Sequence, residues 1–152
     1  MLVGVISDTH GLLRPEAVAA LEGSDVIIHA GDIGTPEVVE HLRQVAPTFA
    51  VRGNNDEGAW AVGVPLTQVV QVGDLLFYVL HQGAQLDLDP VAMGYAAVVS
   101  GHSHRPSVQF RDGVLYLNPG SAGPRRFKLP VVVARVGVVG REMRPEIVEL
   151  DV

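Results

Sequence analysis

Two histidines lie two residues apart in the segment Ser100-Gly101-His102-Ser103-His104. The apolar run Ala96–Val99 precedes them and predicts a short buried strand that ends just before the pair. Alternate side chains of an extended chain point to the same side, and Gly101 relaxes the backbone, so both imidazoles can converge on one point. Imidazole nitrogens are common metal ligands, although an isolated pair of this kind also occurs on ordinary protein surfaces. The metal interpretation gains weight because other strands end in a similar way.

Four more expected strands are followed by side chains that can bind a metal. These side chains are Asp8 and His10 after Leu2–Ile6, Asp32 after Val26–His29, Asn54 after Thr48–Val51, and His81 after Leu75–Leu80. The strand ends of α/β sheets commonly open on a ligand crevice. Imidazole nitrogen and carboxylate oxygen together suit zinc, manganese, iron or nickel. Seven groups exceed the needs of one ion but fit two ions about 3.5–4 Å apart, and Asp32, central in chain order, is expected to bridge them.

Each of these residues taken alone also has a purely structural interpretation. Asp8 could cap a turn, and Asn54 could be a left-handed turn residue, because Asn and Asp favour both roles. Their recurrence at successive strand ends favours the metal interpretation over these alternatives. The two remaining histidines fall outside the pattern, so we predict that His29 is a core polar group and that His41 lies on a helix surface.

The elements that must position these residues follow from hydrophobic patterning and turn chemistry. We expect helices over Pro15–Leu21, over Pro36 to about Val45 with Thr35 as its N-cap, and within Asp87–Tyr95. We expect hairpins over Thr67–Val72 and Leu75–Leu80, over Ser107–Phe110 and Val114–Leu117, and over Val131–Val139 and Glu146–Leu150. The first half is βαβ-like and the second half is rich in strands. This order predicts one α/β domain over residues 1–152, with two mixed sheets packed face to face and helices outside.

Composition excludes several functional classes. The chain has 152 residues and a net charge of −6, so no basic surface is available to hold a long nucleic acid. It has no cysteine, which excludes disulfides, thiolate nucleophiles and cysteine-bound zinc. The apolar runs are too short to span a bilayer, so no membrane partner is expected. The first apolar run lacks a basic leader and continues directly into Asp8 and His10, which favours a cytoplasmic protein.

Together the motifs resemble those of the calcineurin-like metallophosphoesterases, and most closely the small bacterial and archaeal phosphodiesterases of that family. The motifs concerned are Asp8-Thr9-His10, Gly31-Asp32, Gly53-Asn54-Asn55-Asp56, His81, Gly101-His102-Ser103-His104 and the turn Asn118-Pro119-Gly120-Ser121. The resemblance covers nearly the whole chain and implies a four-layer αββα sandwich. It also implies two divalent transition metal ions, with Mn²⁺ favoured and Ni²⁺, Zn²⁺ or Fe as alternatives. The first metal would be held by Asp8, His10, Asp32 and His104, and the second by Asp32, Asn54, His81 and His102.

The expected activity is hydrolysis of the phosphodiester bonds of a small substrate. Two cations held there would lower the pKa of a shared water, and a bridging hydroxide would be expected to attack phosphorus in line while the metals offset the growing charge. The predicted catalytic residues are Asp32, Asn54 and His102, and Asn54 and Arg105 are predicted to bind substrate. A non-catalytic metal-binding scaffold of the same fold and a metal-dependent nuclease are the alternatives. Paired subunits are an expectation from the family likeness alone.

One departure from the family pattern affects the expected chemistry. Many relatives have a histidine at the position of Asn55, and that histidine helps to protonate the leaving group. An amide cannot act as an acid, so we predict weak help for the leaving group and a preference for substrates with good leaving groups.

Further along the chain, Arg125 and Arg126 either contact a substrate phosphate or are surface charges, and core packing is the preferred interpretation of Trp60 and Phe127.

Overall fold

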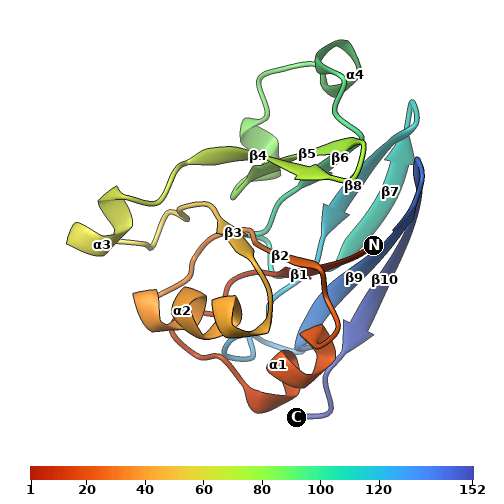
Figure 1. Cartoon of the computed structure of the whole chain (residues 1–152). Helices are drawn as coiled ribbons and strands as arrows, with labels where there is room; N and C mark the ends of the chain where they lie inside the picture. The colour runs from red at the N-terminus through yellow and green to blue at the C-terminus, as the bar shows by residue number, and fades with distance from the viewer.

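Ten strands form two five-stranded sheets that pack face to face in the computed structural model, which describes residues 1–152 (Figure 1). Sheet A has the strand order β10-β9-β1-β2-β3, and sheet B has the order β4-β5-β6-β8-β7. The strands of sheet A are β1 (Leu2–Ile6), β2 (Val26–His29), β3 (Thr48–Ala50), β9 (Val132–Val139) and β10 (Glu142–Glu149). The strands of sheet B are β4 (Thr67–Val72), β5 (Leu75–Leu80), β6 (Ala97–Val99), β7 (Ser107–Arg111) and β8 (Val114–Asn118).

The main core lies between the two sheets and follows from the alternation of side chains along each strand. Val3 and Val5 of β1 belong to a cluster of 18 buried hydrophobic residues that also includes Phe77 and Val79 of β5. The alternate positions of β1 face the other way, and Ile6 joins a second cluster of 14 buried residues under the helices. Strands β1 and β2 of sheet A are therefore buried on both faces, as their nearly continuous apolar sequences predicted.

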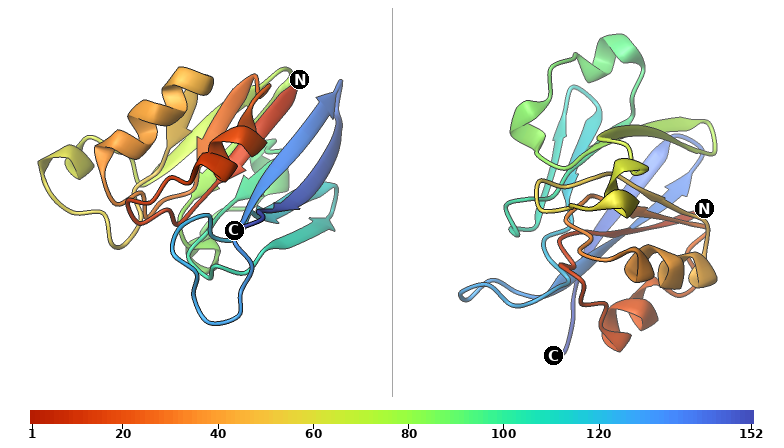
Figure 2. Two further views of the ribbon diagram at one scale, coloured as in Figure 1. Left: turned by 90° about the horizontal axis from the view of Figure 1, so that it is seen from below. Right: turned by 90° about the vertical axis from the view of Figure 1, so that its left-hand side faces the viewer.

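Two helices cover the outer face of sheet A, as both views in Figure 2 show. They are α1 (Pro15–Leu21) and α2 (Pro36–Val45), and each begins with a proline, whose missing N–H needs no partner in the first turn. Thr35 occupies the N-cap position of α2 as predicted, although its side chain makes no capping hydrogen bond. A Cβ on Gly4 would lie 2.8 Å from a Leu21 methyl group, so this glycine lets α1 approach the sheet closely.

A thinner layer covers the outer face of sheet B. It contains the short helices η1 (Gly83–Gln85) and α4 (Pro90–Met93), and α4 lies on the side of the molecule opposite α1 and α2 (Figure 1). Only four residues form the buried cluster beneath this layer, including Tyr78 and Leu80 of β5. The layers therefore succeed one another as helix, sheet, sheet and helix, which confirms the predicted αββα architecture.

The departures from the expected elements are local. The last strand begins at Glu142 rather than Glu146, because β10 is an edge strand in which Pro145 does not interrupt the sheet. The region between Gly58 and Leu66, which has no clean period, contains the short helix α3 (Ala59–Val62). No helix has the length and apolar character that a membrane span requires.

Candidate metal centre

The strand ends that carry the predicted ligands come from both sheets. In sheet A, β1 runs parallel to β2, and β2 runs parallel to β3, so their carboxyl ends lie at one edge. In sheet B, β5 and β6 are also parallel. The loops that leave these strands bring six predicted ligands together in two groups: the Asp8 cluster (Asp8, His10 and His104) and the Asp32 cluster (Asp32, His81 and His102).

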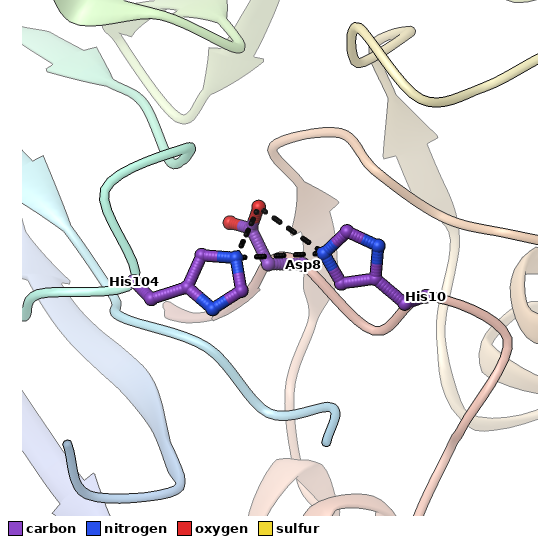
Figure 3. Close-up of side chains that lie close together, drawn as sticks. All are labelled: Asp8, His10 and His104. Carbon is purple, nitrogen blue, oxygen red and sulfur yellow. Dashed lines mark hydrogen bonds and ion pairs between the residues drawn. The ribbon is translucent and has the colours of Figure 1, made fainter. Parts of the chain in front are cut away.

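The Asp8 cluster joins two loops that are far apart in the sequence (Figure 3). Asp8 Oδ1 lies 3.3 Å from His104 Nε2 and 3.9 Å from His10 Nε2. The two imidazole Nε2 atoms are 3.4 Å apart. Ions such as zinc hold nitrogen and oxygen ligands at about 2.0–2.2 Å, which places ligand atoms of one ion about 3–3.6 Å apart. These side chains need only small shifts to reach such spacing.

The Asp32 cluster directly adjoins the first cluster. Asp32 Oδ2 lies 3.3 Å from His81 Nε2 and 3.8 Å from His10 Nε2, so this carboxylate is between the two groups. The predicted seventh ligand, Asn54, also belongs here, because its Oδ1 is 3.1 Å from His102 Nδ1. The structure thus brings all seven predicted ligands to one place, while their individual roles remain predictions.

Two orphaned polar atoms support the fit of metal ions to this site. Asp8 Oδ1 and His81 Nε2 are buried and have no hydrogen-bond partner. His81 Nδ1 is 2.7 Å from the carbonyl oxygen of Ala30 and must donate to it, which leaves a lone pair on Nε2. Buried lone pairs that face one another without a donor are unfavourable unless a cation lies among them. The two His/Asp clusters are consistent with a dinuclear metal site.

The other carboxylate oxygen of Asp8 is fixed by donors. Asp8 Oδ2 accepts hydrogen bonds from the Ser7 hydroxyl at 2.6 Å and from the His102 backbone N–H at 3.1 Å. The Ser121 hydroxyl donates to the Asp8 carbonyl at 3.0 Å. These contacts hold the carboxylate in one orientation and leave Oδ1 free to bind a cation. The pattern of ligands alone did not predict the positioning role of Ser7.

Asp32 is held by the residue that departs from the family pattern. The Asn55 backbone N–H donates to Asp32 Oδ1 at 2.9 Å, and the Asn55 side-chain amide donates to Oδ2 at 3.0 Å. Burial alone would raise the pKa of Asp32, but the adjacent His81 imidazole and the hydrogen bonds from Asn55 hold it well below its usual value. Burial would likewise lower the pKa of His81, but the Asp32 carboxylate, 3.3 Å from its Nε2, raises it overall. Asn55 therefore positions an anionic Asp32.

A second buried carboxylate ties neighbouring loops together. Asp56 accepts hydrogen bonds from the backbone N–H groups of Ile33 at 3.2 Å, Gly34 at 3.0 Å and Gly53 at 2.8 Å. It thereby joins the loop that carries Asp32 to the loop that carries Asn54. A carboxylate that satisfies three backbone donors has a structural reason to be buried, and sequence alone gave no clear role for it.

The ligand loops have unusual backbone geometry. Five of the candidate ligands have positive φ angles, from 48° to 72°: Asp8, His10, Asp32, His102 and His104. Such angles are uncommon outside glycine and cluster at functional sites. The glycines before two ligands are required by close packing, since a Cβ on Gly53 would meet the Asp32 carboxylate and one on Gly101 would meet the Asp8 carboxylate.

The two histidines outside the site have different environments. His29 is fully buried, where its Nδ1 accepts from the Gly31 N–H at 3.1 Å and its Nε2 donates to the Thr9 hydroxyl at 3.0 Å. Burial is the main reason that the pKa of His29 falls to about 3. His41 is exposed on α2. Both predictions, a core polar group and a helix-surface residue, are confirmed.

Of the predicted residues near the site that are not metal ligands, one has an environment that differs from the prediction. Arg105 follows His104 and is exposed. Burial lowers the pKa of the His104 imidazole, and the positive charge of Arg126 lowers it further. Trp60 packs against the helix-side core, as expected. Phe127 does not pack in the core: it is 87% exposed and lies in a turn that the Leu129 N–H closes on the Arg126 carbonyl.

Comparison with known proteins shows the family to which the chain belongs. The model of the calcineurin-like phosphoesterase superfamily domain matches residues 1–140. The chain belongs to that superfamily. It is 32% identical over 161 aligned positions to a protein of Methanothermobacter thermautotrophicus described as a probable metallophosphoesterase, covering 97% of this chain and 92% of that one. It is 29% identical to a phosphodiesterase of Methanocaldococcus jannaschii, covering 79% of this chain and 83% of that one.

A solved structure confirms the fold assignment. The chain superposes on the structure of an archaeal phosphodiesterase with a TM-score of 0.80 and 24% identity, covering 97% of this chain and all of that one. The likeness extends over both sheets and the layers outside them. The resemblance of the sequence motifs to small archaeal and bacterial metallophosphoesterases is therefore confirmed.

Proposed function

We propose that this chain is a metal-dependent phosphodiesterase that hydrolyses small phosphodiesters at a dinuclear centre. The observation that carries the proposal is the adjacency of the two His/Asp clusters, with Asp32 between them and buried lone pairs facing one another without a donor. Divalent ions bound there would acidify a water and offset negative charge on the phosphoryl oxygens. The name of the phosphodiesterase relative supports a diester over a monoester.

The substrate has room beside the Asp32 cluster. A hollow of about 550 Å³ is lined by Asn54 and His81 together with Arg52, Tyr78 and Gln82. Its mixed polar and apolar lining suits one ester substituent of a small phosphodiester. Asn54 and Arg105 are proposed to orient the phosphate, by an amide contact and by charge respectively.

The proposed reaction is hydrolysis of one of the two ester bonds to phosphorus. A water oxygen forms a bond to phosphorus, the ester P–O bond opposite it breaks, and the departing oxygen takes a proton to become an alcohol. Asn55 cannot supply that proton, because an amide is not an acid, and its backbone and side-chain nitrogens each donate to Asp32. We therefore expect the rate to depend steeply on the pKa of the leaving group, with p-nitrophenyl diesters cleaved far faster than alkyl diesters. Equal rates for both classes would contradict this mechanism.

The test is hydrolysis by protein that has been stripped with a chelator and refilled with manganese, nickel, zinc or magnesium. We expect cleavage of bis-p-nitrophenyl phosphate to return with a transition metal, with manganese as the first choice, and to exceed cleavage of p-nitrophenyl phosphate. Metal analysis of each sample should give two ions per chain. Failure to cleave either substrate, combined with no bound metal, would overturn the proposal and favour a scaffold.

A further inference from the structure

The segment that joins β8 to β9 lies against the Asp8 cluster. Its first part is bound to the loop that carries Asp8: the Ser121 hydroxyl donates to the Asp8 carbonyl at 3.0 Å, and the Ala122 N–H donates to the Ser7 carbonyl at 3.1 Å. Gly123 packs so tightly there that a Cβ would collide with the Asp8 and Thr9 carbonyls. The residues that follow, Pro124-Arg125-Arg126-Phe127-Lys128 (the 124–128 loop), protrude from the body of the molecule (Figure 2).

Hydrogen bonds close the base of the 124–128 loop. The Arg125 guanidinium donates to the carbonyls of Leu129 and Val152, each at 3.3 Å. The Leu129 N–H donates to the Arg126 carbonyl at 3.1 Å. Arg125 is therefore a structural residue of the loop, and Arg126, Phe127 and Lys128 at its tip are all exposed. The tip presents side chains to solvent from a fixed base.

Phe127 at the tip is both exposed and strained. Its side chain is 87% exposed, the largest fraction among the large hydrophobic residues of the chain. Its φ angle is 54°, a left-handed conformation that is unfavourable for a bulky residue. Neither burial nor an easy backbone conformation accounts for an aromatic side chain at this place. A flat aromatic face held in solvent is suited to stacking on another ring.

The cations around Phe127 are unpaired. Arg105, Phe127, Lys128 and Leu129 line one open hollow of about 570 Å³. The only Arg or Lys side chain within 4.0 Å of a carboxylate is that of Arg144, which pairs with Glu142. In a chain with a net charge of −6, free cations gathered beside a phosphoryl-transfer site indicate a ligand with additional negative charge. Arg126 directly precedes Phe127 in the loop and is also exposed.

We propose that the 124–128 loop is a nucleotide-binding rim and that the substrates are short single-stranded oligonucleotides. One base stacks on Phe127, the phosphate next to the scissile one binds among Arg105, Arg126 and Lys128, and the scissile phosphate lies at the two clusters. This inference rests on the proposed function and names its substrate class. A short strand fits because the rim offers only a few cations, Arg105, Arg126 and Lys128, in a chain with a net charge of −6. Hydrolysis adds water across one internucleotide P–O bond and yields two nucleotide products.

The first test compares two ratios of kcat/KM in the metal-loaded protein. The substrates are the 5′-phosphorylated thymidine dinucleotide, the same dinucleotide without the 5′-phosphate, and bis-p-nitrophenyl phosphate. We expect Phe127→Ala to lower the ratio of phosphorylated dinucleotide to bis-p-nitrophenyl phosphate about tenfold. Lys128→Ala should lower the advantage of the phosphorylated over the unphosphorylated dinucleotide about threefold to tenfold. The controls Phe110→Ala, an exposed aromatic on β7, and Arg141→Ala, an exposed cation between β9 and β10, should keep the wild-type ratios.

The second test measures binding without catalysis. Calorimetric titration of the metal-free protein with thymidine 3′,5′-bisphosphate should show about tenfold weaker binding in Phe127→Ala than in Phe110→Ala. If wild-type protein cleaves bis-p-nitrophenyl phosphate but both ratios and the binding are unchanged in Phe127→Ala, the rim proposal is wrong and the proposed function stands. If wild-type protein cleaves no substrate with any metal, the proposed function fails, and the titration alone decides whether the loop binds nucleotides. A Phe127→Ala chain that changes its oligomeric state with unchanged ratios would reassign Phe127 to a subunit contact and overturn the proposal.

Discussion

The Asp8 cluster and the Asp32 cluster contain the same kinds of ligand but differ in exposure. In the Asp8 cluster, Asp8 and His104 are buried, and His10 has only 24% of its side chain exposed. In the Asp32 cluster, Asp32 and His81 are buried, but His102 is exposed, as is the neighbouring Asn54. Solvent therefore reaches the Asp32 cluster more easily, through His102 and Asn54, than it reaches the Asp8 cluster. If each cluster binds an ion, we expect the Asp8 cluster to retain its ion longer than the Asp32 cluster.

Substitution of Asp32 should have the largest effect, because this residue lies between the clusters. Asp32→Asn removes a charge that is 3.3 Å from His81 Nε2 and 3.8 Å from His10 Nε2, so both half-sites weaken. We expect turnover of bis-p-nitrophenyl phosphate to fall about 1,000-fold, an effect of the size seen for lost electrostatic stabilisation of a transition state. Circular dichroism checks that the fold survives. Near-normal turnover in a folded variant would show that the two clusters do not share Asp32.

Removal of His102 should distinguish the two half-sites directly. We expect dialysis against a chelator to remove the two ions in separate phases, with the faster phase belonging to the exposed Asp32 cluster. His102→Ala should abolish the fast phase, leave about one ion per chain, and lower turnover by orders of magnitude. The measurement is metal content against dialysis time, with folding checked by circular dichroism. Loss of both ions in a single phase in wild-type protein would contradict the division into two half-sites.

Asn55→Ala should have an intermediate effect confined to the Asp32 cluster. The substitution removes the side-chain donor to Asp32 Oδ2 but keeps the backbone donor to Oδ1. Loss of a residue that orients a metal ligand typically weakens metal affinity by 10–100-fold, and the retained backbone bond favours the lower end, about tenfold. Competition with a metal indicator measures it, and Gln44→Ala on the exposed surface of α2 is the control. Equal affinity in the two variants would remove Asn55 from the positioning role.

The smallest expected effect is that of His29→Gln on the pH dependence of stability, because His29 is buried beside the ligands but is not one of them. Between pH 6.5 and 3 the unfolded chain protonates this histidine, whereas the folded chain keeps it neutral down to a pKa of about 3. The unfolded state therefore binds more protons, and acid lowers the free energy of unfolding by about 1.4 kcal/mol per pH unit from this residue alone. In metal-free protein, His29→Gln should flatten the pH dependence between pH 6 and 5 by about that amount. Urea unfolding measures it, and the exposed His41→Gln should keep the wild-type slope.

Sequence analysis predicted the sheets and the group of ligands for the same physical reason. Buried parallel strands such as Leu2–Ile6 have continuous apolar patterns, and ligands follow them at a fixed edge. The hydrogen bonds that orient the ligands could not be predicted in this way. The bonds from Asn55 to Asp32 and from Ser7 to Asp8 depend on side-chain direction, which neither periodicity nor residue type determines. Asn55 was identified as a departure from the family pattern, but only the structure gave it a role.

The exposure of Phe127 was also not predictable from the sequence. An aromatic residue near apolar neighbours such as Leu129 and Pro130 is typical of a core, and core packing was the sequence-based expectation. The loop closure by Arg125, which donates to the carbonyl of Val152, involves residues 27 positions apart. Nonlocal contacts of this kind carry no signature in a single sequence.

The hydrogen bonds that orient Asp8 also constrain the order of folding. They join Asp8 to Ser121 and His102 across sequence separations of 113 and 94 residues. Closing such long loops is slow, so the ligand geometry forms late, and a nascent chain that ends before β8 lacks it. The candidate metal centre is therefore expected to be among the last parts of the chain to form. Refolding in cobalt should produce the visible absorption of the bound ion with the slowest kinetic phase, after the far-ultraviolet signal of the sheets has recovered.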